Sequence, residues 1–203
     1  MSTQKKRFFT VRKLVVTAMF SAISYVLMLI DFSVPIIPSF VKMDFSELPA
    51  LIAAFSVGPV SGMIVCLVKN LIHLTTTTTG GVGELCNFLL GASFTLTAGL
   101  IYKFHKTRKG ALVGSLLGAL AMALFSIPLN YFVTYPIYTK FLPLDKIIEM
   151  YQAIVPSVNG LLECLVIFNA PFTFFKGIAD AAITFLIYKR ISPLIHGKED
   201  QNA

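Results

Sequence analysis

The chain has 203 residues, of which 56% are hydrophobic and only 13% are charged. An ordinary soluble domain carries about a quarter charged residues, and it would have to be much longer to bury this much apolar surface. The composition therefore excludes an ordinary soluble domain. It predicts one integral membrane domain, built from apolar helices whose side chains face lipid.

The net charge of +7 is concentrated in three basic clusters. These clusters comprise Lys5, Lys6, Arg7, Arg12 and Lys13, then Lys103, Lys106, Arg108 and Lys109, and finally Lys189, Arg190 and Lys198. Aromatic residues do not alternate with the basic ones, as a surface that stacks nucleic-acid bases would require. We therefore expect no nucleic-acid partner, and we use the clusters to orient the chain in the membrane.

The first apolar run, which follows the basic residues 1–13, is interpreted as a membrane helix. It lacks the small-residue cleavage site of a signal peptide, and further apolar segments follow it. The three cysteines, Cys66, Cys86 and Cys164, lie in apolar surroundings without metal-binding spacing, so we expect buried thiols and no metal site.

Six apolar segments follow one another along the chain. A helix needs about 20 apolar residues to cross a bilayer. We expect membrane helices at residues 14–30, 47–57, 60–76, 84–102, 110–133 and 171–190. The threonine run within 75–81 is expected to be a surface loop, and residues 134–170 form an outer connection. The roughly helical spacing of Ile147, Ile148, Tyr151 and Ile154 favours an outer helix within this connection.

The pair Gly58-Pro59 determines how many helices we count. Pro59 has no amide hydrogen and cannot continue a helix without losing a hydrogen bond. Short cytoplasmic loops are enriched in Lys and Arg. With six helices, the N-terminus, the cluster at 103–109 and the C-terminus all fall on the cytoplasmic side, whereas five helices would place 103–109 outside. We therefore expect an all-α bundle of six transmembrane helices with both termini in the cytoplasm.

Polar residues gather near the expected outer ends of four of these helices. In a membrane such groups usually face a cavity or a partner. Asn169, Thr173, Lys176 and Asp180 follow a spacing of four, three and four, which places them on one helical face. An apolar pocket with a few convergent polar groups is typical of a small-molecule site, and amides suit a heterocycle that alternates carbonyls with ring nitrogens. The candidate ligand-binding residues are Glu47, Asn87, Asn130, Thr173, Lys176, Phe40, Val41 and Met43.

Each of the polar candidates also has a structural interpretation. Lys176 and Asp180 could pair with each other, and Asn87 could join two helices. Asn130 follows Pro128 and could cap a helix break, while Glu47 could be a first-turn acid favoured by the helix dipole. We expect Lys69, Asn70 and His73 of the third helix to make structural polar contacts.

The sequence lacks the motifs of ATP hydrolysis and of common hydrolases. It contains no G-x-x-x-x-G-K-[ST], H-E-x-x-H or G-x-S-x-G motif, so we expect no enzyme, no catalytic residues and no cofactor. In the first helix, Ala18 and Ala22 are four residues apart, and small residues at this spacing let another helix approach closely. We expect them to dock a larger membrane partner.

Five local motifs follow one another along the chain. They are DFSELPAL at 44–51, GPVSG at 58–62, GELCNFLLG at 83–91, PLNYF at 128–132 and NAPFTFFKG at 169–177. In this order they resemble the S components of energy-coupling-factor (ECF) transporters, in particular the riboflavin-specific type. The last motif is the most specific, and the resemblance covers nearly the whole chain.

The resemblance implies a high-affinity riboflavin-binding subunit of an ATP-dependent vitamin uptake transporter in a bacterial cell membrane. Riboflavin would be captured at the outer face, with Glu47, Asn130 and Lys176 as polar contacts. Thr173 stands where such proteins often have Asn, and a hydroxyl makes fewer hydrogen bonds than an amide. The implied partners are a transmembrane T component, which Ala18 and Ala22 would contact, and two ABC-type ATPases. The alternatives are FMN, thiamin, biotin or pantothenate as ligand, or an autonomous secondary carrier.

Overall fold

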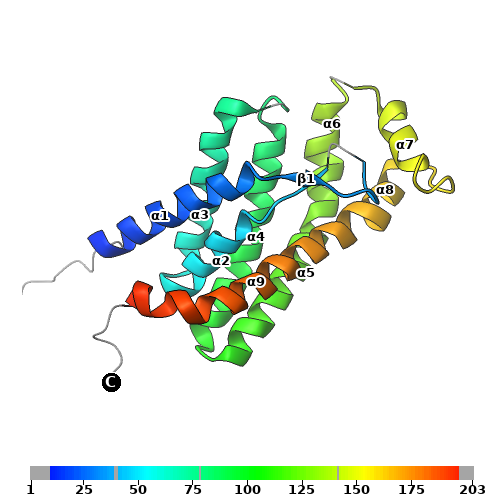
Figure 1. Cartoon of the computed structure of the whole chain (residues 1–203). Helices are drawn as coiled ribbons and strands as arrows, with labels where there is room; N and C mark the ends of the chain where they lie inside the picture. Colours follow the sequence, from blue (N-terminus) through cyan, green and yellow to red (C-terminus); the bar gives the residue numbers. More distant parts are fainter. Residues whose placement is uncertain (1–9, 39–40, 78, 141, 197–203) are drawn as a thin grey trace, which may run out of the picture.

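The computed structural model describes residues 10–38, 41–77, 79–140 and 142–196 (Figure 1). Its long helices are α1 (Val11–Met28), α2 (Glu47–Ser56), α3 (Pro59–His73), α4 (Val82–Phe104), α5 (Arg108–Leu129) and α9 (Ala170–His196). Shorter elements are the 3₁₀ turn η1 (Leu74–Thr76), the π-helical turns η2 (Asn130–Thr134) and η3 (Leu165–Asn169), and the helices α6 (Tyr135–Tyr138), α7 (Leu144–Gln152) and α8 (Leu161–Cys164). The first loop carries the antiparallel strands β1 (Phe32–Ser33) and β2 (Lys42–Met43).

Within these described ranges, five helical segments are long and apolar enough to cross a membrane. They are Val11–Met28, Pro59–Thr76, Val82–Phe104, Arg108–Tyr138 and Leu161–Ile187. The expectation from composition, a mostly helical protein with several membrane helices, agrees with this arrangement.

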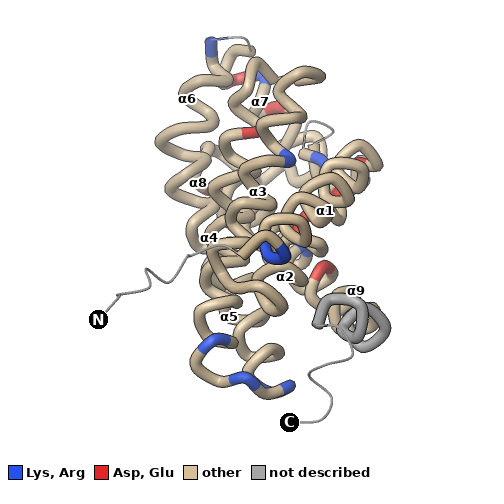
Figure 2. The backbone as a smooth tube through the Cα atoms, turned by 90° about the vertical axis from the view of Figure 1, so that its left-hand side faces the viewer, with Lys and Arg blue, Asp and Glu red and all other residues tan. Residues whose placement is uncertain are grey.

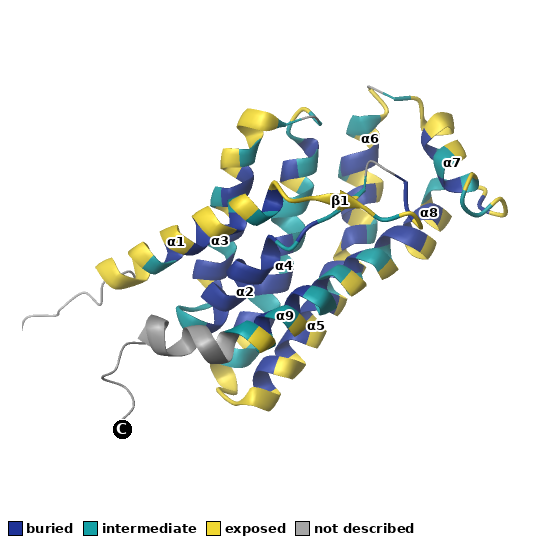
Figure 3. Ribbon diagram, viewed as in Figure 1, coloured by how far each residue is buried: buried dark blue, intermediate teal, exposed yellow. Residues whose placement is uncertain are grey.

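Helix α2 differs from the other long helices because protein surrounds it. Its ten residues span about 15 Å, which is half of a bilayer core. Every residue from Glu47 to Phe55 is buried, and Figure 3 shows α2 in the buried colour between its neighbours. It packs against α1, α3, α4 and α9. The second apolar segment therefore forms part of the protein core, and its apolar side chains pack against other helices.

The chain turns between α2 and α3 at Gly58. This residue has a φ of 140°, a conformation open to glycine but costly for residues with a Cβ atom. Pro59 then occupies the first position of α3, where no amide hydrogen is needed. Gly58 and Pro59 therefore end one helix and begin the next without an intervening loop.

The last two membrane segments extend further than the sequence indicates. We expected helices at 110–133 and 171–190, but α5 continues through η2 and α6 to Tyr138, and the final segment begins at Leu161. Pro128 and Pro171 suggested helix limits in the sequence. Each lies within two residues of a π-helical turn, and such turns let a helix continue where the regular hydrogen-bond ladder is interrupted. The connection between the two segments is correspondingly shorter, and it contains α7.

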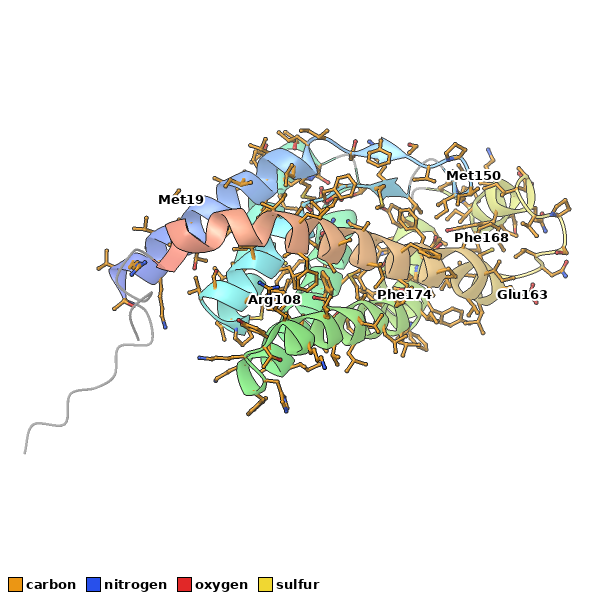
Figure 4. The ribbon with its side chains drawn as sticks, turned by 60° about the horizontal axis from the view of Figure 1, so that its bottom comes forward. Met19, Arg108, Met150, Glu163, Phe168 and Phe174 are labelled. Carbon is orange, nitrogen blue, oxygen red and sulfur yellow. The ribbon has the colours of Figure 1, made fainter. Side chains whose placement is uncertain are left out.

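The two ends of the bundle differ in charge. The basic turn, by which we mean the end of α4, the connection and the start of α5, carries Lys103, Lys106, Arg108 and Lys109, and Figure 2 shows it without acidic residues. Figure 4 shows Arg108 and Glu163 toward opposite ends of the molecule, with Phe174 and Phe168 along the last helix between them. The basic turn therefore marks one end of the bundle, and the outer connection with Glu163 marks the other.

Candidate functional site

A cavity of about 520 Å³ lies at the end of the bundle that carries the first loop and the outer connection. Its wall comes from the first loop, α2, the turn between α3 and α4, the first half of α4, the segment α5–α6, and the junction of η3 with α9. Leu90, Met122 and Phe172 supply apolar surface to it. The volume falls within the range of ordinary small-molecule pockets.

Six of the eight predicted ligand-binding residues line this cavity. They are Val41, Glu47, Asn87, Asn130, Thr173 and Lys176. Met43 lies in β2 opposite Phe32, outside the set of described residues that line the cavity. Phe40 falls outside the described residues. The fold thus brings together side chains from Val41 to Lys176, which are up to 135 positions apart in the sequence.

Four charged side chains, Asp44, Glu47, Lys69 and Lys176, form what we call the charged floor. Lys69 Nζ lies 2.6 Å from Glu47 Oε1, and it also donates to Ser46 Oγ. Lys176 Nζ lies 2.9 Å from Asp44 Oδ2 and 2.9 Å from Glu47 Oε2. The side chains of Lys69 and Glu47 are 0% and 2% exposed. Because an unpaired charge at such depth costs several kcal/mol, each member depends on the others.

The charged floor decides between the interpretations of Lys176 and Glu47. Lys176 pairs with Asp44 and Glu47, whereas both Asp180 carboxylate oxygens are buried without a hydrogen-bond partner among the described residues. Pairing between Lys176 and Asp180 was therefore the wrong alternative. Glu47 does begin α2, but its carboxylate is also the centre of the ion-pair network.

Asp44 ties the first loop to helix α9. Burial by itself raises the pKa of this carboxyl, but the charges of Lys176 and Lys69 act in the opposite direction. The backbone amide of Ser46 also donates to Asp44 Oδ1 at 2.8 Å. Together these interactions hold the pKa of Asp44 below its ordinary value of 3.8, so the carboxylate stays ionised.

Four uncharged side chains, Asn87, Asn130, Asn169 and Thr173, form what we call the amide wall. Asn169 Oδ1 accepts a hydrogen bond of 2.7 Å from Tyr151 Oη, and Asn130 Oδ1 lies 3.6 Å from Cys86 Sγ. Asn87 Oδ1 is buried and has no hydrogen-bond partner among the described residues. A buried acceptor left in this state costs about 1–3 kcal/mol. The amide oxygen of Asn87 therefore offers an acceptor to a ligand, and it does not join two helices.

Two π-helical turns position this wall. Asn130 is the first residue of η2, and Asn169 is the last residue of η3. The chain remains helical through Asn130, so this residue does not cap a helix break. Turns of this kind are frequent at functional sites because the extra residue redirects side chains.

A third group comprises His73, Thr77, Thr79 and Glu84, and we call it the rim cluster; none of its members was among the predicted ligand-binding residues. Glu84 Oε1 lies 2.8 Å from His73 Nδ1. Glu84 Oε2 accepts hydrogen bonds of 2.9 Å from Thr77 and 3.1 Å from Thr79. His73, Thr79 and Glu84 line the cavity. The sequence did contain a signal for this cluster, because Glu84 lies in the first turn of a helix that directly follows the threonine run. We interpreted that run as a surface loop and therefore did not connect its hydroxyl groups with Glu84.

The other residues of the third helix behave as expected from the sequence. Lys69 belongs to the charged floor, and Asn70 Nδ2 donates to the backbone oxygen of Cys66 at 2.8 Å. His73 makes a structural contact too, but it also faces the cavity.

Ala18 and Ala22 lie in a separate groove of about 340 Å³ between α1 and α3. Its other lining residues are Leu14, Thr17, Ser21, Ile64, Val68 and Ile72. The groove is almost entirely apolar, and its small side chains leave space beside α1.

Comparisons with known proteins point to one family. The family described as "ECF transporter, substrate-specific component" matches residues 12–188. The chain is 37% identical to riboflavin transporter RibU of Staphylococcus aureus (strain TCH60), over 89% of this chain and 90% of that protein. It is 35% identical to riboflavin transporter FmnP of Bacillus subtilis (strain 168), over 91% of this chain and 94% of that protein.

A solved structure agrees with these sequence relatives. It is described as the structure and mechanism of the S component of a bacterial ECF transporter. The two chains share 35% identity and a TM-score of 0.72, with 91% of this chain and 97% of the other covered.

Proposed function

Since this chain belongs to the family of ECF transporter substrate-specific components, we propose that it is a riboflavin-binding subunit of an ATP-dependent vitamin uptake transporter. Its family is one of transporter components and not of enzymes. The named relatives, both riboflavin transporters of bacteria, support riboflavin as the ligand and a bacterial cell membrane as the location.

The cavity with its unpartnered amide is the observation that carries this proposal. A flavin ring alternates carbonyl acceptors and ring nitrogens, and side-chain amides can donate and accept at the same time. Asn87 and Asn130 face one cavity beside the apolar residues Leu90, Met122 and Phe172. A flat heterocycle would place its ring against this apolar surface and a donor at Asn87 Oδ1, which has no hydrogen-bond partner in the part of the chain that the structure describes.

The proposed ligand contacts are Glu47, Asn87, Asn130, Thr173, Lys176 and Val41, all of which line the cavity. Lys176 retains two acidic partners, Asp44 and Glu47. We therefore assign it two roles, since it offers donors to the ligand while it holds the first loop in place.

The orientation that fits this function has six membrane elements, α2 included, and both termini in the cytoplasm. The basic turn at Lys103, Lys106, Arg108 and Lys109 supports it, because short cytoplasmic loops are enriched in such residues. The cavity then opens toward the outside, where a vitamin is captured.

The proposed partners are a transmembrane T component and two ABC-type ATPases, because this chain has no ATP-binding loop of its own. The groove beside Ala18 and Ala22 supports docking of the T component on α1. Small residues there let a partner helix approach closely.

Flavin spectroscopy tests the proposal directly. The protein, purified in detergent from cells grown with riboflavin, is expected to be yellow, and the apo-protein is expected to quench riboflavin fluorescence at a one-to-one ratio. A colourless preparation that leaves riboflavin fluorescence unchanged would contradict riboflavin as the ligand. Asn159 is an exposed amide outside the cavity lining, so the variant Asn159→Ala serves as a control. It should leave both the yellow colour and the quenching of riboflavin fluorescence unchanged.

A further inference from the structure

The rim cluster lies at the outer end of the cavity. Glu84 is in the first turn of α4, and Leu90 lies on the same helix in the apolar part of the cavity. At 1.5 Å per residue, these two positions are about 9 Å apart along the helix axis, which is close to the length of a fused three-ring heterocycle. Leu90, Met122, Glu84 and Thr79 line the same cavity, so a ring packed against Leu90 and Met122 leaves Glu84 and Thr79 within reach of a flexible polar chain that the ring carries.

Glu84 is built into the cavity wall as an acceptor. Its side chain is 5% exposed, and His73, Thr77 and Thr79 fix both carboxylate oxygens. Of the three side-chain contacts, one is made to Oε1 and two to Oε2, so Oε1 is the oxygen that has more room for a donor of the ligand. The hydroxyl of Thr79 lies beside it on the cavity wall. This arrangement suits the hydroxyl groups of a sugar alcohol, which can donate to one oxygen and accept from another.

The lysines that face the cavity already hold carboxylates. Four acids, Asp31, Asp44, Glu47 and Glu84, line the cavity together with two lysines, Lys42 and Lys176. Lys176 contacts Asp44 and Glu47, and Lys42 Nζ lies 2.9 Å from Asp31 Oδ2. Among the described residues that line the cavity, both lysines and His73 already contact carboxylates, so none of them is left to neutralise a phosphate, which carries about 1.5 to 2 negative charges at pH 7.

We propose that Glu84 is a specificity-determining residue, which accepts a hydrogen bond from an uncharged polyol chain and repels the same chain when it ends in a phosphate. This inference rests on the proposed function and extends it, because it names riboflavin and excludes FMN as the preferred substrate. The repulsion comes from one fixed carboxylate at the position where the end of the ligand would lie.

The test compares the dissociation constants of FMN and riboflavin for the full chain in detergent, measured by quenching of flavin fluorescence. Wild type is expected to bind riboflavin more than tenfold more tightly than FMN. In Glu84→Gln the ratio of the FMN constant to the riboflavin constant is expected to fall about tenfold, because the repelling charge is gone. Glu149→Gln removes the same charge from an exposed position of α7 and should leave the ratio unchanged.

A second variant covers the case in which Glu84→Gln does not fold. Thr79→Lys keeps the carboxylate but places a cation beside it, and the same ratio is expected to fall. Equal binding of the two flavins by wild type overturns the proposal. The proposal is also overturned if the ratio of the FMN constant to the riboflavin constant is the same in the folded variants as in wild type, or if Glu149→Gln lowers this ratio as much as Glu84→Gln does. If wild type binds riboflavin in any of these cases, the proposed function stands without this specificity; if wild type binds neither flavin, both proposals fail.

Discussion

The charged floor and the amide wall meet at the same cavity, which Asp44, Glu47 and Lys176 of the floor line, but they differ in how their side chains are paired. In the floor, Lys69 and Lys176 each contact acids from other segments at 2.6 to 2.9 Å. In the wall, Asn169 is held by Tyr151, whereas Asn87 Oδ1 is buried and has no hydrogen-bond partner among the described residues. Charge near a ligand cavity can therefore serve mainly to hold helices together, whereas a neutral amide such as Asn87 remains available to the ligand.

The largest expected effect comes from breaking the floor at Lys69. Lys69→Met leaves the Glu47 carboxylate with one cation less in a fully buried position, so we expect a loss of about 3–5 kcal/mol of stability. The measurement is the melting temperature in detergent, obtained by heating samples to a series of temperatures and quantifying the remaining folded protein by size-exclusion chromatography. Lys103→Met, at an exposed position of the basic turn, should leave the melting temperature unchanged.

The double variant Lys69→Met with Glu47→Gln sharpens this test, because it removes both charges of the pair. It should recover part of the lost stability. A single variant as stable as wild type would mean that the pair contributes little to the fold.

A substitution in the amide wall should have a smaller effect, which changes the affinity for the ligand and not the stability of the protein. Asn130→Ala removes an amide that lines the cavity, and we expect riboflavin to bind about 10- to 100-fold more weakly at an unchanged melting temperature. Fluorescence titration and thermal unfolding of the same sample separate the two effects. A loss of stability without a change in affinity would place Asn130 among the structural residues.

Acid should weaken the floor before it affects the wall. The pKa of Asp44 is lower in the folded protein than its ordinary value of 3.8, so its contribution to stability is fully present above that value. The contribution is lost as the pH falls below 3.8 toward the folded pKa. We expect a constant melting temperature between pH 8 and 5, and a decrease of a few degrees below pH 4.

Asp44→Asn identifies the source of this decrease. The variant lacks the titrating group, so it should be less stable at neutral pH and should show a smaller decrease in acid. An equal decrease in the variant and in wild type would assign the acid sensitivity to other carboxyl groups.

The smallest expected effect concerns Thr173, which lines the cavity with a hydroxyl. Thr173→Asn adds a donor and an acceptor, and we expect riboflavin to bind a few-fold more tightly. Titration of wild type and variant under the same conditions measures the difference. Weaker binding would mean that the larger side chain does not fit beside the ligand.

Local regularities in the sequence were enough to predict a mostly helical protein with several membrane helices, and six of the residues that line the cavity. Apolar runs predicted the helical segments, and helical spacing placed Thr173 and Lys176 on one face. The depth of each polar residue within its segment then placed Asn87 and Asn130 at the same level as Glu47. These properties depend on short stretches of chain, so one sequence suffices to derive them.

Contacts between distant segments could not be predicted in this way. Lys176 and Asp44 are 132 positions apart, and nothing in the spacing of either residue indicates the other. Asp180, four residues away on the same helix, was the partner that local geometry suggested. Pro171 likewise suggested a helix start, because a π-helical turn before a proline has no sequence signature of its own.

The two π-helical turns have a consequence for how this cavity changes in evolution. Each contains one residue more than a regular α-helical turn, and each carries a cavity-lining amide, Asn130 or Asn169, at one of its limits. Deleting one residue from η2 or η3 would restore regular α-helix, and because the wider turn absorbs this one extra residue, the helix beyond it would keep its facing. A single codon lost or gained at either place would therefore change mainly the side chains within the turn, Asn130 or Asn169 among them, while the rest of the cavity wall stays in place. Insertions and deletions at these two turns offer a local way to alter the amides that face the cavity.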